Sequence, residues 1–175
     1  ETAAAPKTFG LSYLPEHGFN PYICTATVNR AAFSLLYESL FVVSSHFRAE
    51  PLLCESFTAS EDGKTYRYTL VSGVSFSDGT PLTAQDAAAS LRAAQQSALY
   101  SGRLAHMLSV TADDDRTLTV TLDTAYENFS LMLDVPIVSA ATVQSSTPLG
   151  TGPYYLDGEV LRRSSRWWQT QAPAV

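Results

Sequence analysis

The stretch SFSDGTPLTAQDAAASL (75–91) gathers hydroxyl and carboxylate side chains of the kinds that serve as nucleophiles. A serine or aspartate nucleophile needs a base within reach, and nothing in the sequence links a base to this stretch. Local structure accounts for the same residues. Ser77-Asp78-Gly79-Thr80 is typical of a turn, Thr83 is a natural helix N-cap, and Asp86, three residues later, makes an acidic variant of the capping box. The stretch therefore predicts a turn and a capped helix, and no catalytic site.

Metal-ligand chemistry finds no support in the spacing of histidines and cysteines. His17, His46 and His106 are far apart and form no HExxH pattern, so we interpret them as surface or loop residues. Cys24 and Cys54 are separated by 30 positions with no CxxC, whereas a zinc site needs four closely spaced ligands. Either a disulfide or two buried thiols fits, and the sequence leaves both open. We expect no metal and no cofactor.

Three further motifs each have a structural interpretation. The GTG at 150–152 lacks the Lys-Ser/Thr of a phosphate loop and predicts a backbone turn before a strand. The ADDDR segment (112–116) is more typical of a solvated turn than of a cation site. Trp167 and Trp168 could form a stacking platform, but alternation favours one buried ring and one at an edge.

Composition restricts the class of protein. The chain has 175 residues, of which 45% are hydrophobic and 16% charged, a globular profile with room for one domain or two small ones. No stretch approaches the ~20 apolar residues that span a membrane. The net charge is −6, and the 11 Lys and Arg residues are scattered, so we expect no nucleic-acid binding.

The chain mixes predicted strands and helices, which indicates a mixed α/β (α+β) fold. Residues 7–15 alternate, with Phe9, Leu11 and Tyr13 on one face of a strand. Apolar residues from Val28 to Leu40 recur at helical spacing. Further predicted elements are a turn at 60–65, strands at 65–70 and 117–122, a short helix at 126–133, an extended segment from Pro136, and a loop at 149–158 running into a strand.

Several segments, in this order, resemble the family 5 extracellular solute-binding proteins, the peptide-binding components of ABC importers. The segments are NPY (20–22), LLYESLF (35–41), PLLCESFTASEDGKTYRYTLVSGVSFSDGTPLTAQD (51–86), PLGTGPYYL (148–156) and RSSRWW (163–168). The long block at 51–86 is the most specific. Cys54, Phe57 and Ser72 depart from the residues usual in this block, which suggests a divergent member.

The resemblance implies a type II periplasmic-binding-protein-like fold, of which this chain holds the first lobe and an appended subdomain. Residues 1–45 and 149–175 would be parts of lobe I, and 46–148 the α/β subdomain. The family's second lobe would be absent from the chain. Because the solute of such proteins lies between the lobes, half of the cleft would be absent too.

The resemblance also implies a function. The chain would be a non-enzymatic, monomeric receptor, periplasmic or lipid-anchored at the cell surface, that delivers peptides or a related small solute to an ABC permease. The alternative is a ligand-sensing domain of the same fold fused to a signalling or DNA-binding module. The resemblance also implies solute contacts, because the family positions near the cleft correspond to Asn29, Arg30, Ser34, Tyr100 and Val135. Ordinary packing of Val135 and solvation of Arg30 remain the alternative interpretations.

Overall fold

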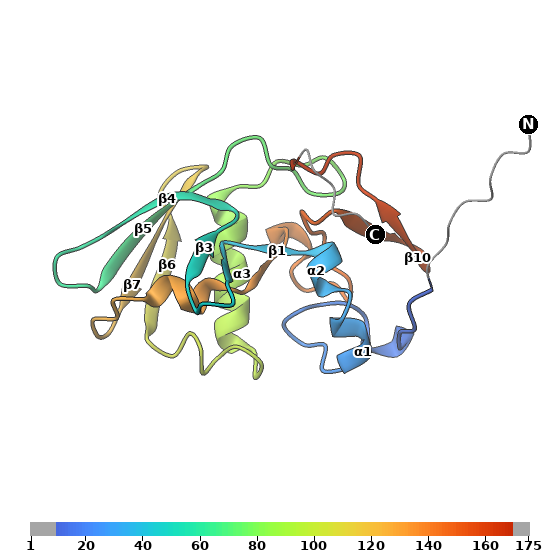
Figure 1. Ribbon diagram of the computed structural model, residues 1–175, viewed down its shortest axis with the longest axis horizontal. Helices are drawn as coiled ribbons and strands as arrows, with labels where there is room; N and C mark the ends of the chain where they lie inside the picture. The colour runs from blue at the N-terminus through green and yellow to red at the C-terminus, as the bar shows by residue number, and fades with distance from the viewer. Residues whose placement is uncertain (1–9, 170–175) are drawn as a thin grey trace, which may run out of the picture.

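The computed structural model describes residues 10–169 and has the mixed α/β composition expected. In Figure 1 a four-stranded sheet lies on the left, the short helices α1 and α2 and the β9–β10 hairpin lie on the right, and β1 lies between. The helices are α1 (Thr27–Arg30), α2 (Phe33–Leu36) and α3 (Ala84–Gln96). The strands are β1 (Glu38–Ser39), β2 (Phe41–Val43), β3 (Ala49–Pro51), β4 (Cys54–Ala59), β5 (Thr65–Leu70), β6 (Met107–Ala112), β7 (Thr117–Leu122), β8 (Pro136–Ile137), β9 (Tyr154–Asp157) and β10 (Val160–Arg163).

The four-stranded sheet is antiparallel in the order β4-β5-β7-β6. Its central strand β5 confirms the predicted alternation, because Tyr66, Tyr68 and Leu70 are buried whereas Arg67 is exposed. The turn predicted at 60–65 closes the β4–β5 hairpin, with Ser60 N donating to the Thr65 carbonyl at 2.9 Å. The predicted strand at 117–122 is β7, which pairs with both β5 and β6.

Helix α3 packs against β6 and β7 and begins where the sequence predicts, with Thr83 as its N-cap. Asp86 Oδ2 accepts hydrogen bonds from the Thr83 backbone N (2.9 Å) and from Thr83 Oγ1 (2.7 Å). The buried face carries mostly small side chains, which allow the helix to approach the sheet closely. The buried residues of α3 are Ala84, Asp86, Ala87, Ala88, Ser90, Leu91 and Ala94.

The structure also has three small two-stranded sheets: β2–β3 and β9–β10 are local hairpins, whereas β1–β8 connects distant parts of the chain. In β1–β8, Glu38 lies opposite Ile137 and Ser39 opposite Pro136. The expected boundary between residues 45 and 46 falls in the turn of the β2–β3 hairpin, where Ser44 N donates to the Arg48 carbonyl. The division into lobe I and a subdomain stays a prediction.

The prediction of one helix over residues 28–40 is wrong. The chain forms two single turns, α1 and α2, and then enters β1. The Leu36 carbonyl accepts the Gly152 N–H at 3.1 Å instead of continuing the helix, and the Leu40 carbonyl accepts the N–H groups of Leu52 and Cys54. Hydrogen bonds to segments outside the predicted helix therefore prevail over the local helical periodicity.

Two other predicted elements also differ from the structure. No strand forms over the described part of 7–15, where residues 10–14 are irregular and Pro15–His17 is a 3₁₀ helix; Phe9 lies outside the described residues. The helix expected at 126–133 is a 3₁₀ helix over Phe129–Leu133. No helix in residues 10–169 is long and apolar enough to cross a membrane.

The two cysteines are separate buried thiols, which resolves the alternatives left open by the sequence. Cys54 Sγ donates to the Ser56 carbonyl at 3.3 Å, and burial raises the pKa of this thiol to about 11. Both side chains fill the apolar core as small hydrophobic residues.

Candidate functional site

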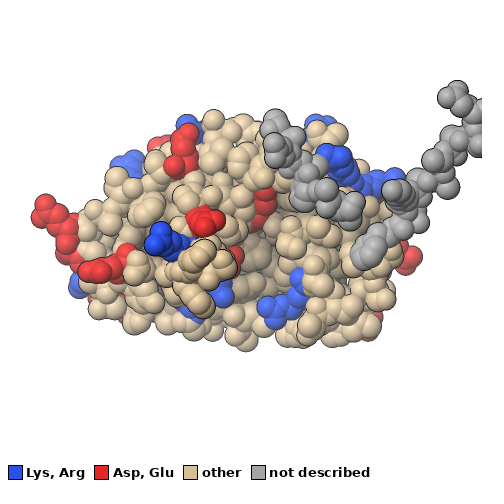
Figure 2. Space-filling view, in the orientation of Figure 1, with Lys and Arg blue, Asp and Glu red and all other residues tan. Residues whose placement is uncertain are grey.

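An open groove of about 460 Å³ lies where α1, α2 and β1 meet the loop that follows α3. Figure 2 shows the surface hollowed near the middle of this face, with cationic and anionic side chains around the hollow. Four aromatic rings contribute to the lining: Phe33, Tyr37, Tyr100 and Trp167. A mostly apolar concave surface with a few placed charges is typical of a small-molecule site.

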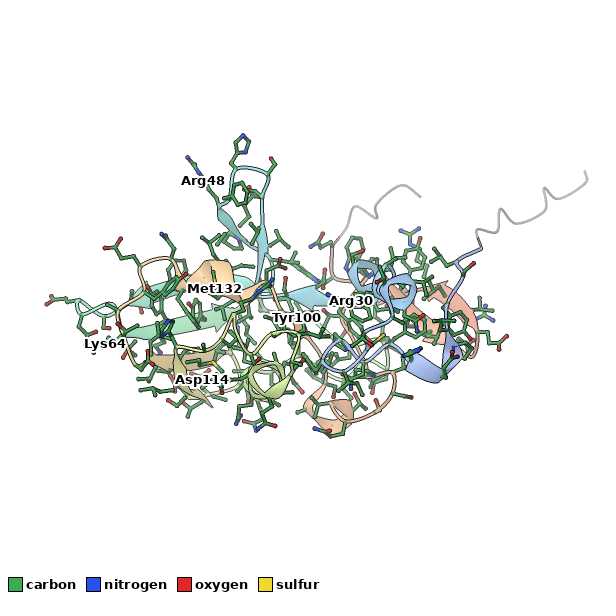
Figure 3. The ribbon with its side chains drawn as sticks, turned by 90° about the horizontal axis from the view of Figure 1, so that it is seen from below. Arg30, Arg48, Lys64, Tyr100, Asp114 and Met132 are labelled. Carbon is green, nitrogen blue, oxygen red and sulfur yellow. The ribbon has the colours of Figure 1, made fainter. Side chains whose placement is uncertain are left out.

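One side of the groove is cationic. Arg30, from α1, and Tyr100, from the loop after α3, lie near each other between the two halves of the molecule (Figure 3). The Arg103 guanidinium lies 5.7 Å from the centre of the Tyr100 ring, and its Nη1 donates to the Asp134 carbonyl at 2.6 Å. Burial raises the pKa of Tyr100; the two arginines oppose that shift, and the Asp134 carboxylate adds to it.

Arg30 differs from Arg103, which is held by the Asp134 carbonyl and the Tyr100 ring. The Arg30 side chain is exposed, and none of the ion pairs among residues 10–169 includes it. Such a guanidinium beside aromatic rings can take a carboxylate or another planar anion through a two-pronged hydrogen bond.

Glu38 contributes a buried carboxylate to the same groove. Its Oε1 accepts Trp167 Nε1 at 3.1 Å, and its Oε2 accepts Trp168 Nε1 and Thr151 Oγ1, each at 2.8 Å. Burial raises the pKa of this carboxyl, and the three hydrogen bonds oppose the shift by stabilising the charged form.

The structure brings together three of the five residues expected to contact solute: Arg30, Ser34 and Tyr100 all line the groove. Asn29 and Val135 have no exposed surface. The Asn29 side chain is bonded inward: Oδ1 accepts Leu14 N, and Nδ2 donates to the Leu14 and Gly18 carbonyls. Val135 packs in the core directly beside Asp134 and Pro136, which do line the groove.

Sequence reasoning missed Glu38, Arg103 and Asp134, and it assigned the tryptophans incorrectly. Both rings are half-buried and both donate to Glu38, so alternation does not divide them into a buried and an exposed residue. Adjacent residues alternate only within a strand, and here they follow the end of β10 in a turn. The signal was present in the motifs LLYESLF and RSSRWW, but nothing in the sequence showed that they meet.

The other candidate chemistries have local explanations. All three histidines are exposed, as expected, and no cluster of metal-ligating side chains occurs in residues 10–169. Asp114 Oδ1 accepts the backbone N–H groups of Arg116 and Thr117, so this part of the acidic segment closes the β6–β7 turn. The GTG segment precedes β9, as predicted, but it is irregular backbone with a bend at Gly152 rather than a turn, and its hydrogen bonds go to Ser77 and Leu36.

Comparison with known proteins gives the family. Residues 48–174 match the family described as "Bacterial extracellular solute-binding proteins, family 5 Middle". The glutathione-binding protein GsiB of Escherichia coli is 31% identical over 174 residues, which cover 89% of this chain and 34% of that protein. A probable peptide ABC transporter periplasmic-binding protein, y4tO of Sinorhizobium fredii, is 27% identical and covers 91% of this chain and 32% of its own length. The chain thus spans about a third of these relatives.

Solved structures confirm the fold. The binding protein AgaA of A. tumefaciens, in complex with agropinic acid, matches with a TM-score of 0.75 at 22% identity over 87% of this chain and 35% of its own. The oligopeptide-binding protein AppA of Bacillus subtilis, in complex with a nonapeptide, matches with a TM-score of 0.69 at 21% identity over 86% and 35%. The fold is the expected one, and the chain belongs to the bacterial extracellular solute-binding proteins of family 5.

Proposed function

We propose that this chain forms one wall of the solute site in the substrate-binding component of an ABC importer, and that the solute is a peptide or a related small molecule. The observation that carries the proposal is the groove, whose lining combines aromatic rings, a buried carboxylate and an arginine that takes part in no ion pair among residues 10–169. Such a surface suits a solute that carries both charged and apolar groups. The names of the relatives GsiB, y4tO and AppA point to the same class of solute.

The proposed contacts are Arg30, Ser34 and Tyr100, the three predicted residues that line the groove. Arg30 would pair with an anionic group of the solute, and the Tyr100 ring would pack on its apolar part. The protein would bind its solute without transforming it, outside the cytoplasmic membrane, and release it to the permease after lobe closure. A monomer suffices for this cycle.

One wall alone should bind weakly. In this family the solute lies between two lobes, and the chain spans about a third of the relatives that it matches. An open wall buries about half of the contact area but still meets most of the translational and ordering cost of association, several kcal/mol. Each ~1.4 kcal/mol lost weakens binding about tenfold.

The test is an NMR titration of the 175-residue chain with glutathione and with a mixed dipeptide and tripeptide library, with calorimetry in parallel. We expect millimolar binding and amide shifts concentrated at Arg30, Ser34 and Tyr100, reduced by Arg30→Ala. Arg48→Ala, in the exposed β2–β3 turn, is the matched control and should leave the shifts unchanged. Shifts confined to another surface would contradict the site, and micromolar binding by the chain alone would contradict the one-wall model.

A further inference from the structure

Both tryptophans of the chain donate to one carboxylate, that of Glu38. The partners are 129 and 130 positions apart, and the third donor, Thr151, is 113 positions from Glu38. A single side chain on β1 therefore joins the turn after β10 and the loop before β9. No other side chain in residues 10–169 connects these three segments through hydrogen bonds.

The carboxylate is held without a compensating positive charge. Glu38 is 7% exposed, its three donors are neutral, and no ion pair among the described residues includes it. Burying an ionised carboxylate costs free energy that neutral hydrogen bonds offset only in part. A glutamate is nevertheless well suited here, because its two oxygens can accept from two adjacent indole N–H groups and a hydroxyl at once.

The two indoles lie in different environments. Trp167 lines the groove together with Glu38, whereas Trp168 packs against the apolar core. Their shared acceptor thus ties a ring of the groove wall to a ring fixed in the core. We infer that Glu38 is a positioning residue that holds Trp167 in the groove wall, with Trp168 and Thr151 as its anchors. This role goes beyond the proposed function, because it does not depend on which solute occupies the groove.

Protonation of Glu38 should loosen the wall. Protonation removes the negative charge and places a proton on one of the oxygens that now accept, so the hydrogen bonds from the two indoles and the Thr151 hydroxyl lose their charge-assisted strength. Burial raises the pKa of Glu38, which places this event above the range of an ordinary glutamate. The charged and titratable groups that face the groove from neighbouring elements are Arg30, Tyr37, Tyr100, Arg103 and Asp134.

Trp168→Phe provides the background for a direct test, because it leaves Trp167 as the only tryptophan of the 175-residue chain and keeps an aromatic ring at position 168. It also removes one of the three donors to Glu38, so in this background Glu38 is held by Trp167 and Thr151 alone. In this background, Glu38→Gln should shift the Trp167 emission to longer wavelength and increase its quenching by acrylamide, with far-UV circular dichroism unchanged. Glu50→Gln replaces an exposed carboxylate on β3 and should change neither signal. Identical emission and quenching in Glu38→Gln and its parent would overturn the inference.

A pH titration of the same emission tests the ionisation. The parent should show a transition with a midpoint above the ordinary glutamate pKa of about 4.3, and Glu38→Gln should lack it. Thr151→Val, which keeps the shape but removes one hydrogen bond to the charged form, should move the midpoint to higher pH. If Glu38→Gln does not fold, the shift of the midpoint in Thr151→Val still tests whether Glu38 is the group that titrates. An unmoved midpoint would contradict the role assigned to Glu38. All readouts are made without solute, so they are independent of the outcome of the binding experiment.

Discussion

Asp86 illustrates how one side chain can link a local motif to the tertiary structure. Its Oδ2 accepts both hydrogen bonds from Thr83 at the start of α3, and its Oδ1 accepts the backbone N–H of Ala140 at 2.8 Å. The residue is 8% exposed. The capping box therefore also fixes the segment that follows β8, which lies 54 positions away.

This arrangement changes the expected effects of substitution. From the sequence we expect Thr83→Ala to cost about 1 kcal/mol and Asp86→Ala a few tenths more. Because Asp86→Ala also leaves the Ala140 N–H without its acceptor, we now expect about 2–3 kcal/mol for it, against about 1 kcal/mol for Thr83→Ala. Chemical denaturation of both variants measures this difference. Asp78→Ala, in the exposed turn, is the control and should cost less. Equal losses for Thr83→Ala and Asp86→Ala would show that the Ala140 bond contributes nothing.

At the scale of elements, the α2–β1 segment and the GTG loop depend on each other. Gly152 N donates to the Leu36 carbonyl, and the loop runs so close to this carbonyl that a Cβ on Gly150 would collide with it. The tight contact ends α2 at Leu36 and directs the chain into β1, where Glu38 enters the groove wall. Glycine is required here for space, since Gly150 has no positive φ.

Gly150→Ala should therefore destabilise the protein strongly, by about 3 kcal/mol or more, because the obstacle is backbone rather than a flexible side chain. Gly102→Ala is the matched control: a Cβ there meets nothing within 4 Å, and the melting temperature should hardly change. Thermal melts of the two variants, followed by circular dichroism, measure the difference. A Gly150→Ala variant as stable as Gly102→Ala would mean that the loop can move away from α2 at little cost.

At the scale of the whole molecule, three aspartates and Glu38 make the stability of the fold depend on pH in opposite directions. Hydrogen bonds lower the pKa values of Asp62, Asp78 and Asp114, chiefly those from Ser60 Oγ, Thr80 N and Arg116 N respectively. Burial raises the pKa of Glu38. The aspartates lie in exposed turns, whereas Glu38 lies at the junction of the two halves of the molecule.

The directions of these pKa shifts predict how the stability of the fold depends on pH. The three aspartates stabilise the fold at pH values above the unfolded aspartate pKa of about 3.9, and this contribution is lost as the pH falls through their lower folded values. Glu38 has a raised folded pKa, so its contribution increases as the pH falls through the window between its folded and unfolded values. Melting temperatures measured from pH 7 downward should thus show a small gain or plateau before the acid loss. Glu38→Gln should remove the small gain or plateau and leave the loss of stability in acid unchanged. Unchanged profiles in Glu38→Gln would contradict this assignment.

Elements governed by neighbouring residues could be predicted from the sequence. The alternation in β5 and β7, the turns at 60–65 and 113–116, and the capped start of α3 depend on contacts within a few positions, and all are confirmed. Family membership was also visible in the sequence, because the block at 51–86 is long and specific. Arg30, Ser34 and Tyr100 were placed through that resemblance.

Only the tertiary structure decided the rest. The periodicity of residues 28–40 favours one helix, yet the hydrogen bonds of the Leu36 and Leu40 carbonyls to distant N–H groups break it into two turns and a strand. The cysteines could have been bridged or free until the fold buried each separately. Glu38 and the tryptophans lie in two separate motifs, and only chain folding brings a carboxylate within hydrogen-bonding distance of donors 129 and 130 positions away. Local preferences are encoded residue by residue, whereas the partners of a buried polar group depend on which distant segments pack together.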